Sequence, residues 1–212
     1  YSILENVVIH DEVTSIGDGA FAYNIIRNLY LGKGVEEIGT SAFVQGGNNY
    51  IQRVDISDLD AWCRIRFNKN STGAISFSST PVSYNTDIYV NDVLVSEVEI
   101  PDDVTEIGQI AFYNWKQLKN VIIHDNVLKI GDSAFYYCSG LSEIQLPEAL
   151  TEIGASAFYS CSNLESIKIP SGVKEIKPYA FYNCDKLSVV ELSEGAECIC
   201  NEAFGSCGSI KS

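Results

Sequence analysis

The dipeptide Ala-Phe recurs seven times along the chain, and no other feature constrains the fold as strongly. Its phenylalanines are Phe21, Phe43, Phe112, Phe135, Phe158, Phe181 and Phe204. They are 22, 69, 23, 23, 23 and 23 residues apart, and 69 is three times 23. A fixed period of about 20 to 50 residues is the sequence signature of proteins built from stacked repeats. The sequence therefore predicts a solenoid, in which each repeat forms one coil and packs on its neighbours.

Each repeat also carries an apolar pattern of the form Leu-x-x-Ile-x-Ile, upstream of the Ala-Phe pair. Leu164, Ile167 and Ile169 are one example, and Leu141, Ile144 and Leu146 are another. Such alternation predicts a strand with one face in the core and the other in solvent. Pro170 and its equivalents follow these strands and are expected to end them. Stacked coils would join the strands into a parallel sheet.

The Ala-Phe segments are too short for a long helix, so each is predicted to form a single helical or 3₁₀ turn. Small polar residues stand where they would cap that turn, and these are Asp18, Thr40, Asp132 and Asn201. An isoleucine stands five residues before every phenylalanine of the Ala-Phe pairs and is expected in the core. One coil cannot bury its apolar residues alone, but a stack of coils makes a continuous core.

The complete pattern resembles the 23-residue leucine-rich repeat of BspA-like and treponemal bacterial surface proteins. Residues 4–56 and 95–212 match that pattern. One repeat shows it in full, with Ile153, Gly154, Ala157, Phe158, Cys161, Leu164, Ile167, Ile169 and Pro170 in register. The resemblance implies an α/β repeat solenoid, a right-handed coil with a parallel β-sheet on its concave side and short helical or 3₁₀ turns. It also implies a protein that is extracellular or at the cell surface.

The repeat is interrupted over residues 57–94, but its phase is kept across the interruption. We therefore predict a single leucine-rich-repeat solenoid domain over residues 1–212, with an irregular, elaborated coil at 57–94. Residues 88–95 are predicted to form a hairpin with Asn91 and Asp92 at its turn, because Asn and Asp tolerate positive φ. Residues 88–90 would supply the strand of this coil. Both ends fall inside a repeat, so we expect the natural protein to continue on at least one side.

Composition excludes several classes of function. The chain has 212 residues, 46% of them hydrophobic, and a formal net charge of −14. Its 14 basic residues are scattered, so the chain lacks the basic patch that nucleic acid or an anionic membrane surface requires. No apolar run approaches the ~18 residues of a membrane span. We expect no nucleic-acid partner and no membrane insertion within this chain.

Motifs that carry catalysis or bind cofactors are missing from the sequence. It has no G-x-S-x-G motif, no phosphate-binding glycine loop and no H-E-x-x-H motif. His10 and His124 occupy the same repeat column, too many coils apart to share a metal ion or a reaction. We expect a protein that is not an enzyme, with no catalytic residue, no cofactor and no metal site.

Four of the seven cysteines form one repeat column, which consists of Cys138, Cys161, Cys184 and Cys207. A spacing of 23 residues differs from the close pairs of a zinc site, so these cysteines are predicted to be reduced, buried and apolar in role. Cys63 is also expected in the core. Cys198 and Cys200 form a C-x-C pair, with Cys200 in place of the usual glycine. A redox or metal role for that pair stays open.

Two surface features remain as candidate binding sites. The first is the outward face of the strands, where candidate partner-binding residues are Tyr30, Arg53, Asp55, Glu97, Glu99, Ile122, Gln145, Lys168 and Glu191. The second is a column of tyrosines one residue after the phenylalanines, made of Tyr113, Tyr136, Tyr159 and Tyr182. Aromatic rows can stack on sugar rings or anchor a protein partner. Alternatively, each tyrosine simply packs on its neighbour with the hydroxyl in water.

These observations favour a non-enzymatic surface or secreted protein that presents a concave repeat surface for interaction or adhesion. Its partner would be a protein, for example an extracellular protein of a host. One alternative is a carbohydrate-binding module that holds glycans on the tyrosine column. Another is a repeat spacer within a larger multidomain surface protein or enzyme.

Overall fold

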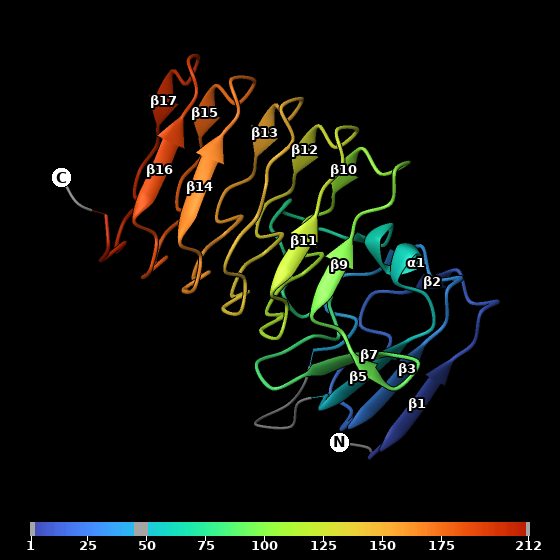
Figure 1. The fold of residues 1–212 in the computed structure, drawn as a ribbon. Coiled ribbons are helices and arrows are strands. Elements are labelled where there is room, and N and C mark those ends of the chain that lie inside the picture. The colour runs from blue at the N-terminus through green and yellow to red at the C-terminus, as the bar shows by residue number, and fades with distance from the viewer. Residues whose placement is uncertain (1–2, 45–50, 211–212) are drawn as a thin grey trace. The chain divides into compact units, whose positions relative to one another are not determined.

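The structure, a computed structural model, describes residues 3–44 and 51–210. These residues divide into two compact units, one within residues 1–95 and the other within 96–212. In each unit, equivalent strands of successive coils pair in parallel (Figure 1). The fold is a parallel-strand solenoid with little helix, which confirms the predicted fold class. That residues 1–212 form one solenoid domain remains a prediction.

The first unit contains one sheet of long strands and one of two-residue strands. The long-strand sheet has the order β1-β3-β5-β7-β8, with β1 (Asn6–Ile9), β3 (Asn28–Leu31), β5 (Arg53–Ile56), β7 (Asp87–Val90) and β8 (Val93–Leu94). The second sheet contains β2 (Ser15–Ile16), β4 (Glu37–Ile38) and β6 (Arg66–Phe67). Leu29 and Leu31 are buried while Asn28 and Tyr30 are exposed, so the side chains alternate between core and solvent as predicted.

The irregular coil at 57–94 follows the prediction closely. β7 pairs in parallel with β5, so residues 87–90 supply the strand of this coil. β7 and β8 form an antiparallel hairpin, and Asn91 and Asp92 at its turn have φ values of 50° and 62°. A short helix, α1 (Leu59–Cys63), begins after Asp58, whose side chain accepts the backbone N–H of Ala61 at 2.8 Å. Trp62 and Cys63 of this helix are buried.

The second unit is built in the same way. Its long strands are β9 (Glu97–Glu99) paired with β11 (Asn120–Ile122), and β14 (Ser166–Ile169) paired with β16 (Val189–Leu192). Its short strands form one five-stranded sheet of β10 (Glu106–Ile107), β12 (Lys129–Ile130), β13 (Glu152–Ile153), β15 (Glu175–Ile176) and β17 (Cys198–Ile199). The sheets of short strands contain the isoleucine column, for which the sequence indicates no strand. Its members from Ile16 to Ile176 are buried as expected, whereas Ile199, in the last coil, is 56% exposed.

One expected strand is missing from this unit. Residues 141–147 are described by the structure and carry no strand, although Leu141 and Ile144 are buried as the alternation predicts. Alternation reports which side chains enter the core, and it does not require that the backbone pair regularly with its neighbours. The strand predicted for Leu146 and its neighbours is therefore wrong, whereas the burial of Leu141 and Ile144 is confirmed.

The Ala-Phe segments are runs of β-turns, so the predicted helical or 3₁₀ turn is wrong. The N–H of Ala134 bonds to Gly131 in its own coil at 3.2 Å, but the N–H of Phe135 bonds to Ala157 of the next coil at 2.8 Å. Ser133, directly before Ala134, has a φ of 55°. Positive φ is left-handed backbone, which no right-handed helix can include. The segment therefore turns tightly and uses alternate N–H groups to join the coils.

The residues expected to cap these turns join neighbouring coils instead. Asp18 accepts the backbone N–H of Thr40, 22 residues away, at 2.6 Å. Asp132 likewise accepts the N–H of Ala155 in the next coil at 2.9 Å. Because the turns are not helical, they leave no helix N-terminus to cap, and the carboxylates satisfy N–H groups of the following coil.

The core of the second unit is a continuous stack of phenylalanine rings. Phe158 stacks on Phe135 with centroids 5.2 Å apart and on Phe181 with centroids 5.1 Å apart. The stack extends to Phe112 at one end and Phe204 at the other. The fully buried rings at its centre confirm that the Ala-Phe repeat is a core column.

Candidate functional site

The candidate partner-binding residues lie on the solvent side of the chain in both units. Tyr30, Arg53 and Asp55 belong to the first unit, and the other six belong to the second. Tyr30 is 39% exposed and Ile122 is 47% exposed, which leaves sizeable apolar surface in solvent. Glu97, Glu99, Gln145, Lys168 and Glu191 are also exposed.

In the first unit, parallel register aligns outward side chains into a row. Val8, Tyr30, Asp55 and Tyr89 are direct neighbours on β1, β3, β5 and β7. Neighbouring strands are about 4.8 Å apart, so adjacent side chains in this row are within contact distance. The sequence analysis did not single out Tyr89, although the period of 2 along residues 88–90 marks it as an outward residue.

Arg53 is held firmly on this face. Its guanidinium donates to both carboxylate oxygens of Asp55, at 2.7 and 2.5 Å, and to Asp92 at 2.5 Å. The same group lies over the ring of Tyr89, 4.1 Å from the centroid. The hydrogen bonds that Arg53 donates to Asp55 and Asp92 raise the pKa of Arg53, so its positive charge is permanent. Val8, Tyr30, Arg53, Asp55, Tyr89 and Asp92 are called the arginine patch below.

In the second unit, outward residues meet in two pairs of strands. Register places Glu97 beside Asn120 and Glu99 beside Ile122 on β9 and β11. His124 lies with its Nε2 3.0 Å from Oε1 of Glu99.

On β14 and β16, Lys168 and Glu191 are neighbours. Lys168 donates to Glu148 at 2.6 Å. Gln145 is exposed on the segment without a strand.

The tyrosine column of the second unit is an aromatic ladder. Consecutive rings of Tyr113, Tyr136, Tyr159 and Tyr182 are stacked, with centroids 5.8, 4.5 and 5.0 Å apart. All four side chains are half-buried. Burial, with the neighbouring tyrosines as a further cause, raises the pKa of Tyr136 to about 12. The ladder that the sequence predicts is therefore formed, and neighbouring rings cover most of one another's faces.

Two further tyrosines extend this aromatic surface outward. Tyr137 is 40% exposed and meets Tyr136 edge-on with centroids 4.8 Å apart. Tyr179 is 38% exposed and meets Tyr182 edge-on at 5.6 Å. Both have positive φ, at 62° and 59°. Because tyrosine has no preference for that conformation, no sequence pattern indicates where these rings point.

The cysteine column confirms the prediction of burial for three of its four members. Cys138, Cys161 and Cys184 are fully buried, Cys207 is partly exposed, and all four are free thiols. Burial raises the pKa of Cys138 and of Cys161. These thiols therefore stay protonated at neutral pH and can donate hydrogen bonds. Cys63 is buried as expected.

Stacked coils with parallel strands, a phenylalanine core and exposed strand faces define a bacterial-type leucine-rich-repeat solenoid. The model of the BspA type leucine-rich repeat region matches residues 1–119 and 83–211, with 6 copies. The chain belongs to the BspA-type leucine-rich repeat family, as its sequence pattern implied. A search of curated protein sequences found no significant match.

Three solved structures share this fold. A leucine rich cell surface protein from Faecalibacterium prausnitzii has a TM-score of 0.65 and 24% identity, over 98% of this chain and 59% of that one. A leucine rich repeat protein from T. pallidum has a TM-score of 0.56 and 21% identity, over 93% and 83% of the two chains. The pneumococcal vaccine antigen PcpA has a TM-score of 0.54 and 18% identity, over 98% and 64%.

These likenesses concern the fold, because each identity is 24% or lower. The chain spans 59% of the length of the F. prausnitzii protein. Two of the three relatives are described as a cell surface protein and a vaccine antigen, and none is described as an enzyme. In the part of this chain that the structure describes, no helix has the length and apolar character needed to cross a membrane.

Proposed function

We propose that this chain is a non-enzymatic interaction protein, secreted or at the bacterial cell surface. It binds a protein partner through the outward faces of its long strands. The arginine patch carries the proposal, because it is a preformed group of charged and aromatic side chains that point away from the core. Core packing has no need of Arg53, Asp55 or Tyr89 on that side of the sheet.

The chemistry of the arginine patch suits protein recognition. Arginine and tyrosine are enriched among the few residues that dominate binding energies at protein interfaces. Asp55, Asp92 and the Tyr89 ring hold Arg53 in one geometry, so little side-chain entropy remains to be lost on binding. The exposed Val8 and Tyr30 add apolar area beside the charge.

Binding to purified extracellular-matrix proteins, measured by surface plasmon resonance, tests this proposal. For any protein on this panel that binds, the double variant Arg53→Ala, Tyr30→Ala should weaken the affinity by about tenfold or more, as expected for central interface residues. Tyr84→Ala is the matched control, because Tyr84 is an exposed tyrosine of the same unit outside the long strands. Equal affinities for the wild type and the double variant would contradict a role for the arginine patch.

The outward side of β9, which carries Glu97 and Glu99, is a second candidate surface within the same proposal. Glu97 and Glu99 project from β9 into solvent, beside the exposed Ile122. Reversing both charges to lysine should weaken binding of a basic partner and leave folding intact, since both side chains lie outside the core. Circular dichroism checks the fold of this variant. Turnover of a substrate by this chain alone would contradict the non-enzymatic role.

A glycan-binding role is the alternative that the tyrosine ladder favours. Sugar rings stack on exposed aromatic faces, and Tyr137 and Tyr179 offer exposed rings next to the ladder. A glycan array probed with wild type and with Tyr113→Ala, Tyr136→Ala and Tyr159→Ala variants separates the two proposals. If the wild type binds a glycan and these variants do not, the result favours a carbohydrate-binding module. A chain that binds neither proteins nor glycans favours the spacer role within a larger protein.

A further inference from the structure

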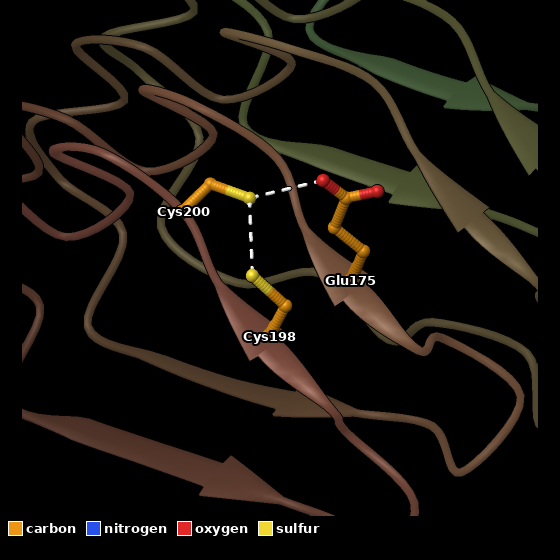
Figure 2. Close-up of side chains that lie close together, drawn as sticks. All are labelled: Glu175, Cys198 and Cys200. Atoms are coloured by element: carbon orange, nitrogen blue, oxygen red, sulfur yellow. Dashed lines mark hydrogen bonds between the residues drawn. The ribbon is translucent and has the colours of Figure 1, made fainter.

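Two cysteines and one glutamate of the second unit lie together on the solvent side of its short strands. β15 and β17 are parallel, and their register places Glu175 beside Cys198. Ile176 is buried, so the side chain before it faces outward. Cys200 follows Cys198 by two residues and returns to the same side, because side chains alternate along an extended backbone. The three side chains converge (Figure 2).

The possible ligand atoms are spaced as a small cation requires. Sγ of Cys200 is 3.5 Å from Sγ of Cys198 and 3.0 Å from Oε1 of Glu175. One such atom from each residue lies within 4.8 Å of the other two. In a tetrahedral zinc site with Zn–S bonds of about 2.3 Å, two sulfurs are about 3.8 Å apart and a carboxylate oxygen is about 3.5 Å from each. Small side-chain rotations would bring the three atoms to those separations.

Packing does not account for the two cysteines. Cys161 of the buried column is fully enclosed, whereas Cys198 is exposed and Cys200 is partly exposed. Cys200 stands in the repeat position that Gly154 occupies two coils earlier. A Cβ built on Gly154 would lie 2.4 Å from the backbone nitrogen of Asp132, so that coil excludes a side chain there. The coil between them carries Lys177 at this position, so the glycine pattern ends before Cys200, and the thiol of Cys200 is only partly buried there.

A disulfide between Cys198 and Cys200 would join Cα atoms near the upper limit of the usual separation. Residues two apart on an extended strand have Cα atoms about 6.6 Å apart. Most disulfides join Cα atoms about 5.5 to 6 Å apart, with an upper limit near 6.8 Å. A cation held between the two sulfurs does not require the two Cα atoms to move closer together.

Charge around the three residues favours a cation. Glu175 adds a carboxylate to a chain whose formal net charge is −14. The nearby cation Lys177 donates a hydrogen bond to Glu152 of the preceding coil. Two sulfur ligands select a thiophilic metal over Mg²⁺ and Ca²⁺, which prefer oxygen ligands throughout.

We propose that Glu175, Cys198 and Cys200 bind one zinc ion, with solvent or a group from another molecule as the fourth ligand. The ion would tie β17 to β15 through side chains, in addition to their backbone pairing. The sequence leaves a metal role open for Cys198 and Cys200 but does not indicate Glu175, because Glu175 reaches the cysteines through strand register and not through sequence proximity. It is independent of the interaction surface proposed above.

Titration with Co²⁺ tests the site on the full chain, reduced and freed of metal. Thiolate ligation of Co²⁺ gives a charge-transfer absorption, and Zn²⁺ should displace Co²⁺ and remove it. We expect one Co²⁺ per chain. Cys198→Ser and Cys200→Ser should each weaken binding by about tenfold or more, since loss of even an outer-shell partner costs that much. Glu175→Gln should weaken binding and keep the thiolate absorption.

Cys207→Ser is the matched control, because it removes a partly exposed thiol of the same unit outside the three residues. This variant should bind Co²⁺ as the wild type does. Mass mapping of the wild type alone gives a second measurement, since Zn²⁺ should protect Cys198 and Cys200 from alkylation. An absent thiolate absorption in the wild type, unchanged binding in the Cys198→Ser and Cys200→Ser variants, or lack of protection by Zn²⁺ would each overturn the proposal.

Discussion

The thiol of Cys161 donates a hydrogen bond to the backbone carbonyl of Phe135, 26 residues earlier, at 3.2 Å. The same carbonyl accepts the backbone N–H of Cys138 at 3.1 Å, so both of its lone pairs are used. Cys184 makes the same bond to Phe158 at 3.2 Å. The column of cysteines thus links each coil to the one before it. An apolar residue of similar size could fill the same space without supplying this bond.

Native alkylation should distinguish the buried column from the exposed pair. Cys138, Cys161 and Cys184 should remain unmodified, because burial excludes the reagent and keeps the thiols protonated. In the metal-free protein, Cys198 is exposed and should react. In denaturant without reductant, all seven cysteines should react, as counted by mass spectrometry. Two or more pairs of thiols that stay resistant under those conditions would show disulfides and contradict the free state.

Much of this architecture follows from the period of the sequence. The phenylalanine, tyrosine and cysteine columns each recur at one repeat position, so stacking of the coils brings their members into contact. Phe135 and Phe158, for example, are 23 residues apart and stack at 5.2 Å. The hairpin turn at Asn91 and Asp92 was predictable because both residue types tolerate positive φ.

Other features leave no periodic signal in the sequence. The strands around Ile130 and Ile153 have two residues each, too short for alternation to be recognised. The left-handed positions of the Ala-Phe turns hold residues such as Ser133 and Tyr179, where glycine would have indicated a turn. The partners of Arg53 also depend on the hairpin, since Asp92 reaches Arg53 from 39 residues away.

Phe158→Ala should be severely destabilising. The ring is fully buried and stacks between Phe135 and Phe181, so its removal leaves a cavity that touches two neighbouring coils. Truncation of a core phenylalanine typically costs about 3–5 kcal/mol of unfolding free energy. Urea denaturation followed by circular dichroism measures the loss, and Tyr84→Ala at an exposed position is the control. A melting temperature within a degree or two of wild type would show that Phe158 is not a core residue.

The hairpin turn predicts opposite effects for two substitutions of one residue. Asn91 has a φ of 50°, which glycine adopts without strain. Asn91→Gly should therefore leave the unfolding free energy within about 0.5 kcal/mol of wild type or raise it slightly. Asn91→Val should lower it by about 1–2 kcal/mol, because side chains clash with the backbone at positive φ. Equal stabilities of the Gly and Val variants in urea denaturation would contradict the left-handed turn.

The tyrosine ladder should make stability fall at alkaline pH. Tyr136 has a pKa of about 12 in the fold, raised first by burial and then by Tyr159 and its other neighbours. A tyrosine in an unfolded chain ionises near pH 10. Because the folded state holds the proton more tightly, the contribution of Tyr136 is complete below about pH 10 and is lost as pH rises from there through about 12.

The measurement is the melting temperature as a function of pH, together with the tyrosinate absorbance of the native protein. Tyr136→Phe removes the ionising hydroxyl but keeps the stacked ring, so its melting temperature should fall less steeply between about pH 10 and 12 than that of the wild type. Tyr84→Phe removes a hydroxyl from an exposed tyrosine outside the ladder and should follow the wild-type curve. If Tyr136→Phe also follows the wild-type curve, the ladder does not shift the ionisation of Tyr136, and the alkaline loss of stability has another origin.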